Sequence, residues 1–172
     1  MSGNELSSGI ISAAQWSSAI LPILDEGCNL KLPLSGLSMY PLLVGGRDEV
    51  LITTVLRKKL KRGDIALYVR KDGTHVLHRI HHVKNNMYYM LGDAHTWIEG
   101  PIKEEDVLAV ATTVIRKEKM ILCSQYSYKI ISGLWLLVRP LRPIILKIFR
   151  GLCCLWNGGA NETIHAQQGS IK

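Results

Sequence analysis

Three side chains of this 172-residue chain have the types that acyl-transfer chemistry requires: a hydroxyl, an imidazole and a carboxylate. Ser38 lies between Gly36 and Pro41, and glycine and proline favour a bent backbone that can present one hydroxyl on a rigid support. Serine is common in turns as a capping residue, so a nucleophile also requires a base and an orienting acid. His78 is the candidate base, and Asp93 is the candidate acid.

His78 belongs to a run with four histidines in eight residues. On a β-strand, alternation places His78 and His82 on one face and His75 and His81 on the other. Residues four apart on a strand are separated by roughly 13 Å, which is too far for one metal ion. Because no cysteine or clear carboxylate cluster joins these histidines, we expect no metal and no cofactor.

The segment around these residues has the pattern of β-structure, with short apolar runs separated by turn residues. Lys61–Asp64 and Asn85–Asn86 are two of the expected turns, and residues 92–102 are expected to form a loop. Linked antiparallel hairpins of this kind form a small coiled β domain or partial barrel, so the expected fold class is mainly β. The expected strands lie at 30–34, 49–55, 65–69, 75–83, 87–91 and 107–116.

The flanking segments differ from this β domain in composition. Near the N-terminus, two short helices are expected, broken at Pro22 and ended at Gly27. No apolar run approaches the roughly 20 residues of a membrane-spanning helix. We expect an N-terminal helical extension at 1–28, a catalytic β domain at 29–119, an amphipathic segment at 120–156 and a disordered tail at 157–172.

The net charge of +7 is concentrated towards the C-terminus, because residues 129–172 hold six Lys and Arg residues against Glu162 alone. A nucleic-acid-binding domain more often carries its own basic stripe, so no nucleic-acid partner is expected.

A helical wheel shows how the charges of the C-terminal segment are arranged. Arg142, Lys147 and Arg150 lie within about 80° of Arg139. A basic amphipathic helix with a tryptophan is typical of a segment that lies in an anionic membrane surface, and we expect residues 130–156 to bind one. The alternative is a helix that packs its apolar face on the β domain. The opposite arc holds Leu141, Ile144, Ile145, Ile148, Phe149, Leu152, Leu155 and Trp156.

Four motifs follow one another along the chain: Gly36–Pro41, Arg62–Tyr68, Val76–Ile80 and Leu91–Asp93. Together, in this order, they give the chain a resemblance to the signal peptidase I family. They span roughly residues 30–117, and the chain most resembles the branch that uses a Ser–His rather than a Ser–Lys pair. The related LexA-type self-cleaving repressors share the Ser-Met motif but have a lysine where this chain has His78.

The resemblance implies a role for each matching residue. Ser38 would be the nucleophile, and His78 the general base that takes its proton and returns it to the leaving amine. Asp93 would lie near this dyad and orient the imidazolium, and Glu99 matches a second acidic position in that branch. The backbone N–H groups of Ser38 and Met39 would form the oxyanion hole.

The implied function is a serine endopeptidase that cleaves leader or signal sequences from precursor polypeptides through an acyl-enzyme. It would be associated with the bacterial cytoplasmic membrane, on a face that the sequence leaves open. Two alternatives stay open: a LexA-like self-cleaving regulator and a non-catalytic peptide-binding scaffold. The scaffold is suggested by Gly36, where many members of the family carry serine, and by Ala94, where asparagine is usual.

Overall fold

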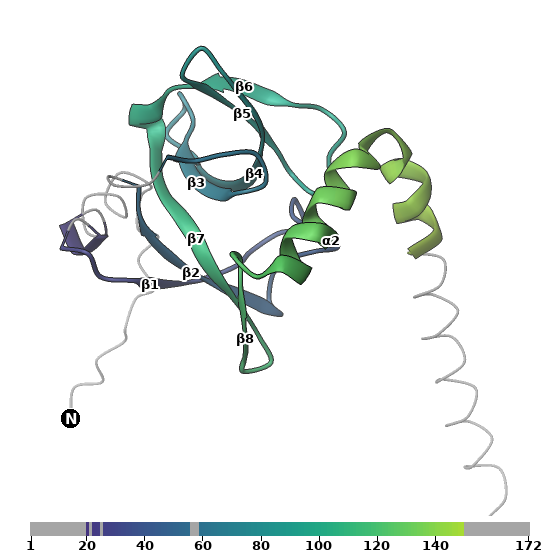
Figure 1. Cartoon of the computed structure of the whole chain (residues 1–172), viewed down its shortest axis with the longest axis horizontal. Coiled ribbons are helices and arrows are strands. Elements are labelled where there is room, and N and C mark those ends of the chain that lie inside the picture. Colours follow the sequence, from purple (N-terminus) through teal and green to yellow (C-terminus); the bar gives the residue numbers. More distant parts are fainter. Residues whose placement is uncertain (1–19, 21, 25, 56–58, 150–172) are drawn as a thin grey trace, which may run out of the picture.

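The computed structural model describes residues 20, 22–24, 26–55 and 59–149 (Figure 1). Eight antiparallel strands form one sheet, so the expectation of a mainly β fold is confirmed. The strands are β1 (Leu30–Pro33), β2 (Asp48–Thr54), β3 (Ile65–Val69), β4 (His75–Lys84), β5 (Met87–Leu91), β6 (Glu99–Ile102), β7 (Val107–Arg116) and β8 (Lys119–Leu122). The helices are η1 (Glu104–Asp106), α2 (Tyr126–Leu137), η2 (Arg139–Leu141) and a final helical stretch at 142–149.

The long strand β7 connects three parts of the sheet, because it pairs with β2, β3 and β8. The order of the sheet is β1-β2-β7-β3-β4-β5-β6, with β8 paired to β7. Register shifts between Leu51 and Ile52 and between Leu67 and Tyr68 bend the sheet where β7 passes from β2 to β3. β-bulges of this kind increase the local twist. In Figure 1, α2 and the helical turns after it lie along one side of this β body.

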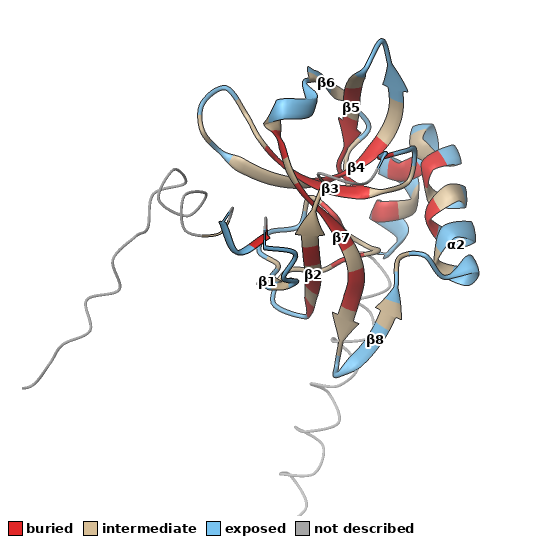
Figure 2. Cartoon of the chain, turned by 60° about the vertical axis from the view of Figure 1, so that its left-hand side comes forward, coloured by how far each residue is buried: buried red, intermediate tan, exposed pale blue. Residues whose placement is uncertain are grey.

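The sheet is buried on both faces at its centre, as the alternation within β3 shows. Ile65 and Leu67 belong to one hydrophobic cluster, and Ala66 and Tyr68 belong to the other. Successive side chains of a strand point to opposite faces, so β3 separates two cores. Figure 2 shows buried residues along β2, β3, β5 and β7. A strand buried on both faces supports the residues around it rigidly.

The expected strands lie within one residue of β1, β2, β3, β4, β5 and β7 at both ends, but two strands were not expected. β6 lies in the segment that was expected to be a loop, because its Gly100 and Pro101 are poor strand formers. β8 follows a tight turn made by Lys117 and Glu118, both at positive φ (47° and 66°). Neither is a typical residue for that conformation, so the sequence does not mark this hairpin.

The expected alternation of the histidines is wrong after Ile80. A bulge between Ile80 and His82 leaves His81 as an extra residue opposite β5. As a result, the rings of His81 and His82 lie together, with their Nδ1 atoms 2.8 Å apart, and are not on opposite faces. His78 precedes the bulge and remains buried.

The C-terminal helices differ from the helical-wheel expectation at Arg142, which was placed on the exposed basic face of an amphipathic helix. Arg142 and Leu146 are buried, with 0% and 6% of their surfaces exposed, because the final helix packs through these two side chains. Leu141, Ile144 and Ile148 of the expected apolar arc stay exposed. No helix among the described residues is long and apolar enough to cross a membrane.

Some expectations lie outside the described residues. These are the tail at 157–172, most of the N-terminal extension and the end of the amphipathic segment, which includes Arg150 and Trp156. Residues 20 and 22–24 are helical, and Gly27 follows at a φ of 82°, as expected of a residue that ends a helix.

The segment that carries Ser38 is anchored by the buried carboxylate of Asp48. Its oxygens accept hydrogen bonds from the backbone N–H of Val44 at 2.9 Å and from Arg116 at 2.8 and 2.9 Å. Arg116 also donates to the carbonyl oxygen of Leu42 at 2.6 Å. Asp48 and Arg116 therefore join the loop between β1 and β2 to the end of β7.

We predict that Asp48→Asn lowers the free energy of unfolding by about 2–3 kcal/mol, because charge-assisted hydrogen bonds are lost at a buried position. Urea unfolding measures the loss as a lower midpoint at unchanged slope. Asp72→Asn is the control, because Asp72 is exposed. Equal midpoints for the two variants would show that Asp48 does not anchor the loop.

Candidate active site

One cavity brings together the two residues that the sequence proposes as nucleophile and base. It has a volume of about 880 Å³ and lies between β1 and the β3–β4 hairpin. Ser38 and His78 both line it, although forty positions separate them in the sequence, and His95 lines it as well. Its apolar wall is contributed by Leu32, Leu34, Met39, Leu43, Leu67, Val76 and Leu77.

Gly92 lies close to the backbone of Ser38 and to the rings of His78 and His95. A Cβ atom at Gly92 would lie 2.8 Å from the carbonyl oxygen of Ser38 and 3.1 Å from Nε2 of His78. It would also lie 2.6 Å from Nδ1 of His95. The carbonyl of Ser38 in turn accepts a hydrogen bond from the N–H of Ala94 at 2.9 Å. Glycine therefore allows the loop after β5 to contact both the serine segment and the Nε2 side of His78.

The imidazole of His78 is 2% exposed, and its second nitrogen faces polar groups of two other strands. Nδ1 lies 3.2 Å from the hydroxyl of Tyr68 on β3 and 3.9 Å from a carboxylate oxygen of Glu99 on β6. Burial, and then the neighbouring His95, lower the pKa of His78 to about 4, although Glu99 acts in the opposite direction. The imidazole is therefore neutral, and able to accept a proton, at neutral pH.

Glu99 is held in place by Arg70 at the end of β3. The guanidinium donates to both carboxylate oxygens, at 2.5 and 2.6 Å. These hydrogen bonds lower the pKa of Glu99, so the carboxylate is ionised beside His78. A bidentate pair also fixes the carboxylate in direction, because the guanidinium is planar.

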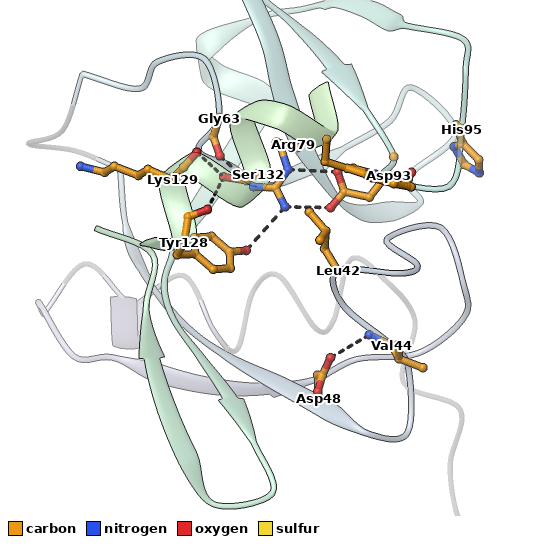
Figure 3. A network of polar contacts seen from close by, with 12 residues as sticks. Leu42, Val44, Asp48, Gly63, Arg79, Asp93, His95, Tyr128, Lys129 and Ser132 are labelled. Atoms are coloured by element: carbon orange, nitrogen blue, oxygen red, sulfur yellow. Dashed lines mark hydrogen bonds and ion pairs between the residues drawn. The ribbon is translucent and has the colours of Figure 1, made fainter. Parts of the chain in front are cut away.

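Asp93 has different partners from those that the resemblance implies. Its two oxygens accept from Nε and Nη2 of Arg79 at 3.0 and 2.7 Å, and both side chains are fully buried (Figure 3). Arg79 also donates to the carbonyl oxygen of Gly63 at 3.0 Å and lies 3.5 Å from the hydroxyl of Tyr128. Burial alone would lower the pKa of Arg79, but Asp93 raises it above its usual value. The acid beside His78 is therefore Glu99, whereas Asp93 joins its loop to β4.

The C-terminal helices hold the same loop from outside. Trp135 of α2 donates from its indole N–H to the carbonyl oxygen of Asp93 at 2.8 Å. Arg142 donates to the carbonyl oxygens of Gly92 at 2.9 Å, His95 at 2.7 Å and Trp135 at 3.0 Å. The loop that contacts Ser38 and His78 is thus clamped between β4 and the helices.

The backbone around Ser38 offers hydrogen-bond donors to a ligand. Among the described residues, no backbone carbonyl accepts from the N–H groups of Ser38 and Met39. The turn that holds Ser38 and Met39 is closed by a hydrogen bond from the N–H of Tyr40 to the carbonyl oxygen of Leu37 at 3.1 Å. The N–H groups of Ser38 and Met39 are therefore available to a ligand, as the donors of an oxyanion hole must be.

Comparison with known proteins adds no identification: no family model, curated protein or solved structure matches this chain. Within the described part of the chain, no group of three or more His, Cys, Asp or Glu residues could hold a metal ion. The interpretation of the site therefore rests on its own geometry.

Sequence reasoning missed four residues of this site. Tyr68 ends one of the four motifs, but no role was expected for it, and no contact was expected for Arg70 or His95. Arg142 was placed on the basic face of an amphipathic helix. The sequence signal for Tyr68 is the expected hairpin, which pairs its strand with the strand of His78. In the structure Ala66 lies opposite His78, and Tyr68 is two residues further along the same face of β3.

The different environments of the two acids lead to a prediction about stability. Asp93→Asn leaves the buried Arg79 without its counter-ion, so we expect it to lower the free energy of unfolding by about 3–5 kcal/mol. Glu99→Gln breaks a partly exposed pair with Arg70, and we expect a loss of about 1 kcal/mol or less. Denaturant titration of both variants measures the difference. A Glu99→Gln protein that is the less stable of the two would contradict this assignment.

Proposed function

We propose that the protein is a serine endopeptidase with a signal-peptidase-like β domain that cleaves leader or signal sequences of precursor polypeptides. The observation that carries the proposal is the shared cavity of Ser38 and His78, with Nε2 of His78 and the backbone of Ser38 both beside Gly92. A neutral, buried imidazole is suited to act as general base without needing to lose a proton first.

In the proposed reaction, Oγ of Ser38 forms a bond to the scissile carbonyl carbon while Nε2 of His78 takes the hydroxyl proton. The carbonyl oxygen becomes an oxyanion, which the N–H groups of Ser38 and Met39 stabilise. Collapse breaks the C–N bond, and His78 returns its proton to the leaving amine. Water activated by His78 then hydrolyses the acyl-enzyme. Glu99 stabilises the imidazolium electrostatically in both steps.

Two features of the cavity support an extended polypeptide as the substrate. Among the described strands β1 stands at the end of the order, so one of its edges has no partner strand there. An extended peptide can add to a free strand edge through its backbone, while pockets select alternate side chains. The apolar lining around Leu32, Leu67 and Leu77 favours apolar residues near the cleavage site.

The proposed mechanism predicts which variants lose activity. Cleavage of precursor peptides should fall at least 100-fold in Ser38→Ala and in His78→Ala, because the nucleophile and the general base are removed. The controls are Ser127→Ala and His82→Ala, which should retain wild-type rates. Peptide binding without cleavage in the wild type would favour the scaffold, and cleavage only of its own chain would favour a LexA-like regulator.

The low pKa of His78 predicts an unusual pH profile. Only the neutral imidazole accepts the proton of Ser38, so kcat/KM should stay on its plateau from pH 7 to pH 5 and fall as the pH passes down through about 4. An ordinary histidine would give a fall near pH 6.5. Rates of peptide cleavage between pH 3.5 and pH 8 measure this. A half-maximal rate between pH 6 and pH 7 would contradict the buried environment of the base.

We also propose that the helical face from α2 to residue 149 binds an anionic membrane surface. Figure 2 shows exposed residues along the side of α2 turned away from the sheet. The chain has no acidic residue between Glu118 and Glu162, whereas Lys129 and Lys147 are exposed. The exposed apolar side chains are Ile130, Ile131, Leu134, Leu137, Leu141, Ile144, Ile148 and Phe149.

The membrane proposal predicts that Ile144→Glu and Ile148→Glu together weaken binding to vesicles containing phosphatidylglycerol by about 100-fold or more, because each buried isoleucine contributes roughly 1.5–3 kcal/mol. Co-sedimentation measures the bound fraction. Met120→Glu, an exposed position on β8, should bind like the wild type. Equal binding of all three proteins would show that this face is not the membrane-binding surface.

A further inference from the structure

Two strands, β3 and β6, bring polar groups to the Nδ1 side of His78, whereas Nε2 lies beside Gly92. Tyr68 is fully buried, and its hydroxyl lies 3.2 Å from Nδ1. The nearer oxygen of Glu99 lies 3.9 Å from the same nitrogen, beyond the range of a direct hydrogen bond. The tyrosine hydroxyl is therefore the group that contacts the imidazole.

The protonation states of the neighbours limit what this hydroxyl can do. Glu99 is ionised by its pairing with Arg70, so it only accepts hydrogen bonds. Burial, and then a hydrogen bond to Glu99, raise the pKa of Tyr68, so the phenol keeps its proton. A single O–H proton is thus available, and two acceptors compete for it.

The ionised carboxylate is the stronger acceptor, because hydrogen bonds to a charged group are roughly twice as strong as those between neutral groups. The hydroxyl of Tyr68 therefore donates to Glu99, and its oxygen accepts from an N–H at Nδ1 of His78. A neutral imidazole carries only one ring proton. With that proton on Nδ1, Nε2 keeps its lone pair on the side of Gly92 and Ser38.

We propose that Tyr68 is a positioning residue that selects the Nδ1–H tautomer of His78 and connects it to the charge of Glu99. The catalytic consequence rests on the proposed function, but the tautomer itself does not. When Nε2 takes the proton of Ser38, the Nδ1–H bond stays in place and the new positive charge faces Tyr68 and Glu99. No proton passes through Tyr68, so the phenol is unchanged after each turnover.

The direct test is ¹⁵N NMR of the His78 ring at pH 7 in the wild type, Tyr68→Phe and Glu99→Gln. We expect the wild type to show a protonated Nδ1 and an unprotonated Nε2. In Tyr68→Phe, which keeps the buried ring, the Nε2–H form should become the major one or equal the other. Tyr88→Phe, at another buried tyrosine, should match the wild type. A protonated Nε2 in the wild type, or an unchanged tautomer in Tyr68→Phe, would overturn the proposal.

Peptide cleavage separates this proposal from the proposed function. If the wild type has Ser38-dependent activity, Tyr68→Phe should lower kcat roughly 10- to 100-fold, less than the loss of the general base itself, and leave KM nearly unchanged. If activity depends on Ser38 but kcat is unchanged in Tyr68→Phe, only the positioning role of Tyr68 is contradicted, and the peptidase proposal stands. Turnover that does not depend on Ser38 contradicts the peptidase proposal, and the tautomer is then decided by NMR.

Discussion

The buried ion pair between Arg79 and Asp93 is the interaction on which the geometry of the site depends. Two charges without solvent exposure are costly to bury, and here the cost is offset by a bidentate contact and by the carbonyl oxygen of Gly63. Because Arg79 follows His78 on β4 and Asp93 follows Gly92, the pair brings the histidine strand and the glycine loop together. Ser38 is held by the same loop through the N–H of Ala94.

In the proposed mechanism, the two acids have different roles. Both carboxylate oxygens of Asp93 accept hydrogen bonds from Arg79. Asp93 could therefore pair with a protonated His78 only by giving up contacts with Arg79. Glu99 is tied to Arg70 at the edge of the cavity, where 23% of its side chain is exposed, and it faces the imidazole. Burial keeps His78 neutral, and the ionised Glu99 lowers the free energy needed to protonate the imidazole. The Arg79–Asp93 pair therefore fixes the position of the glycine loop, and Glu99 adjusts the pKa of His78.

The sequence predicts the strands well where apolar residues alternate or run together, as in β3 and β7. It also predicts that Ser38 and His78 belong together, but only through the order of its motifs. It does not predict the contact of Arg70 with Glu99, because 29 positions separate them and the pairing depends on the bulges of β4 and β5. Arg142 could not be predicted to be buried, since a charge is normally solvated; three backbone carbonyls compensate it here.

The central claim is that His78 activates Ser38 for acyl transfer. Its most direct test is the mass of the intact protein after mixing with an activated peptide ester at pH 5, followed by mapping of the modified residue. The account predicts one acyl group on Ser38 in the wild type, none on Ser38 in Ser38→Ala and a strongly reduced amount in His78→Ala, with His82→Ala unaffected. Acylation of another residue, or equal acylation of Ser38 with and without His78, would contradict it.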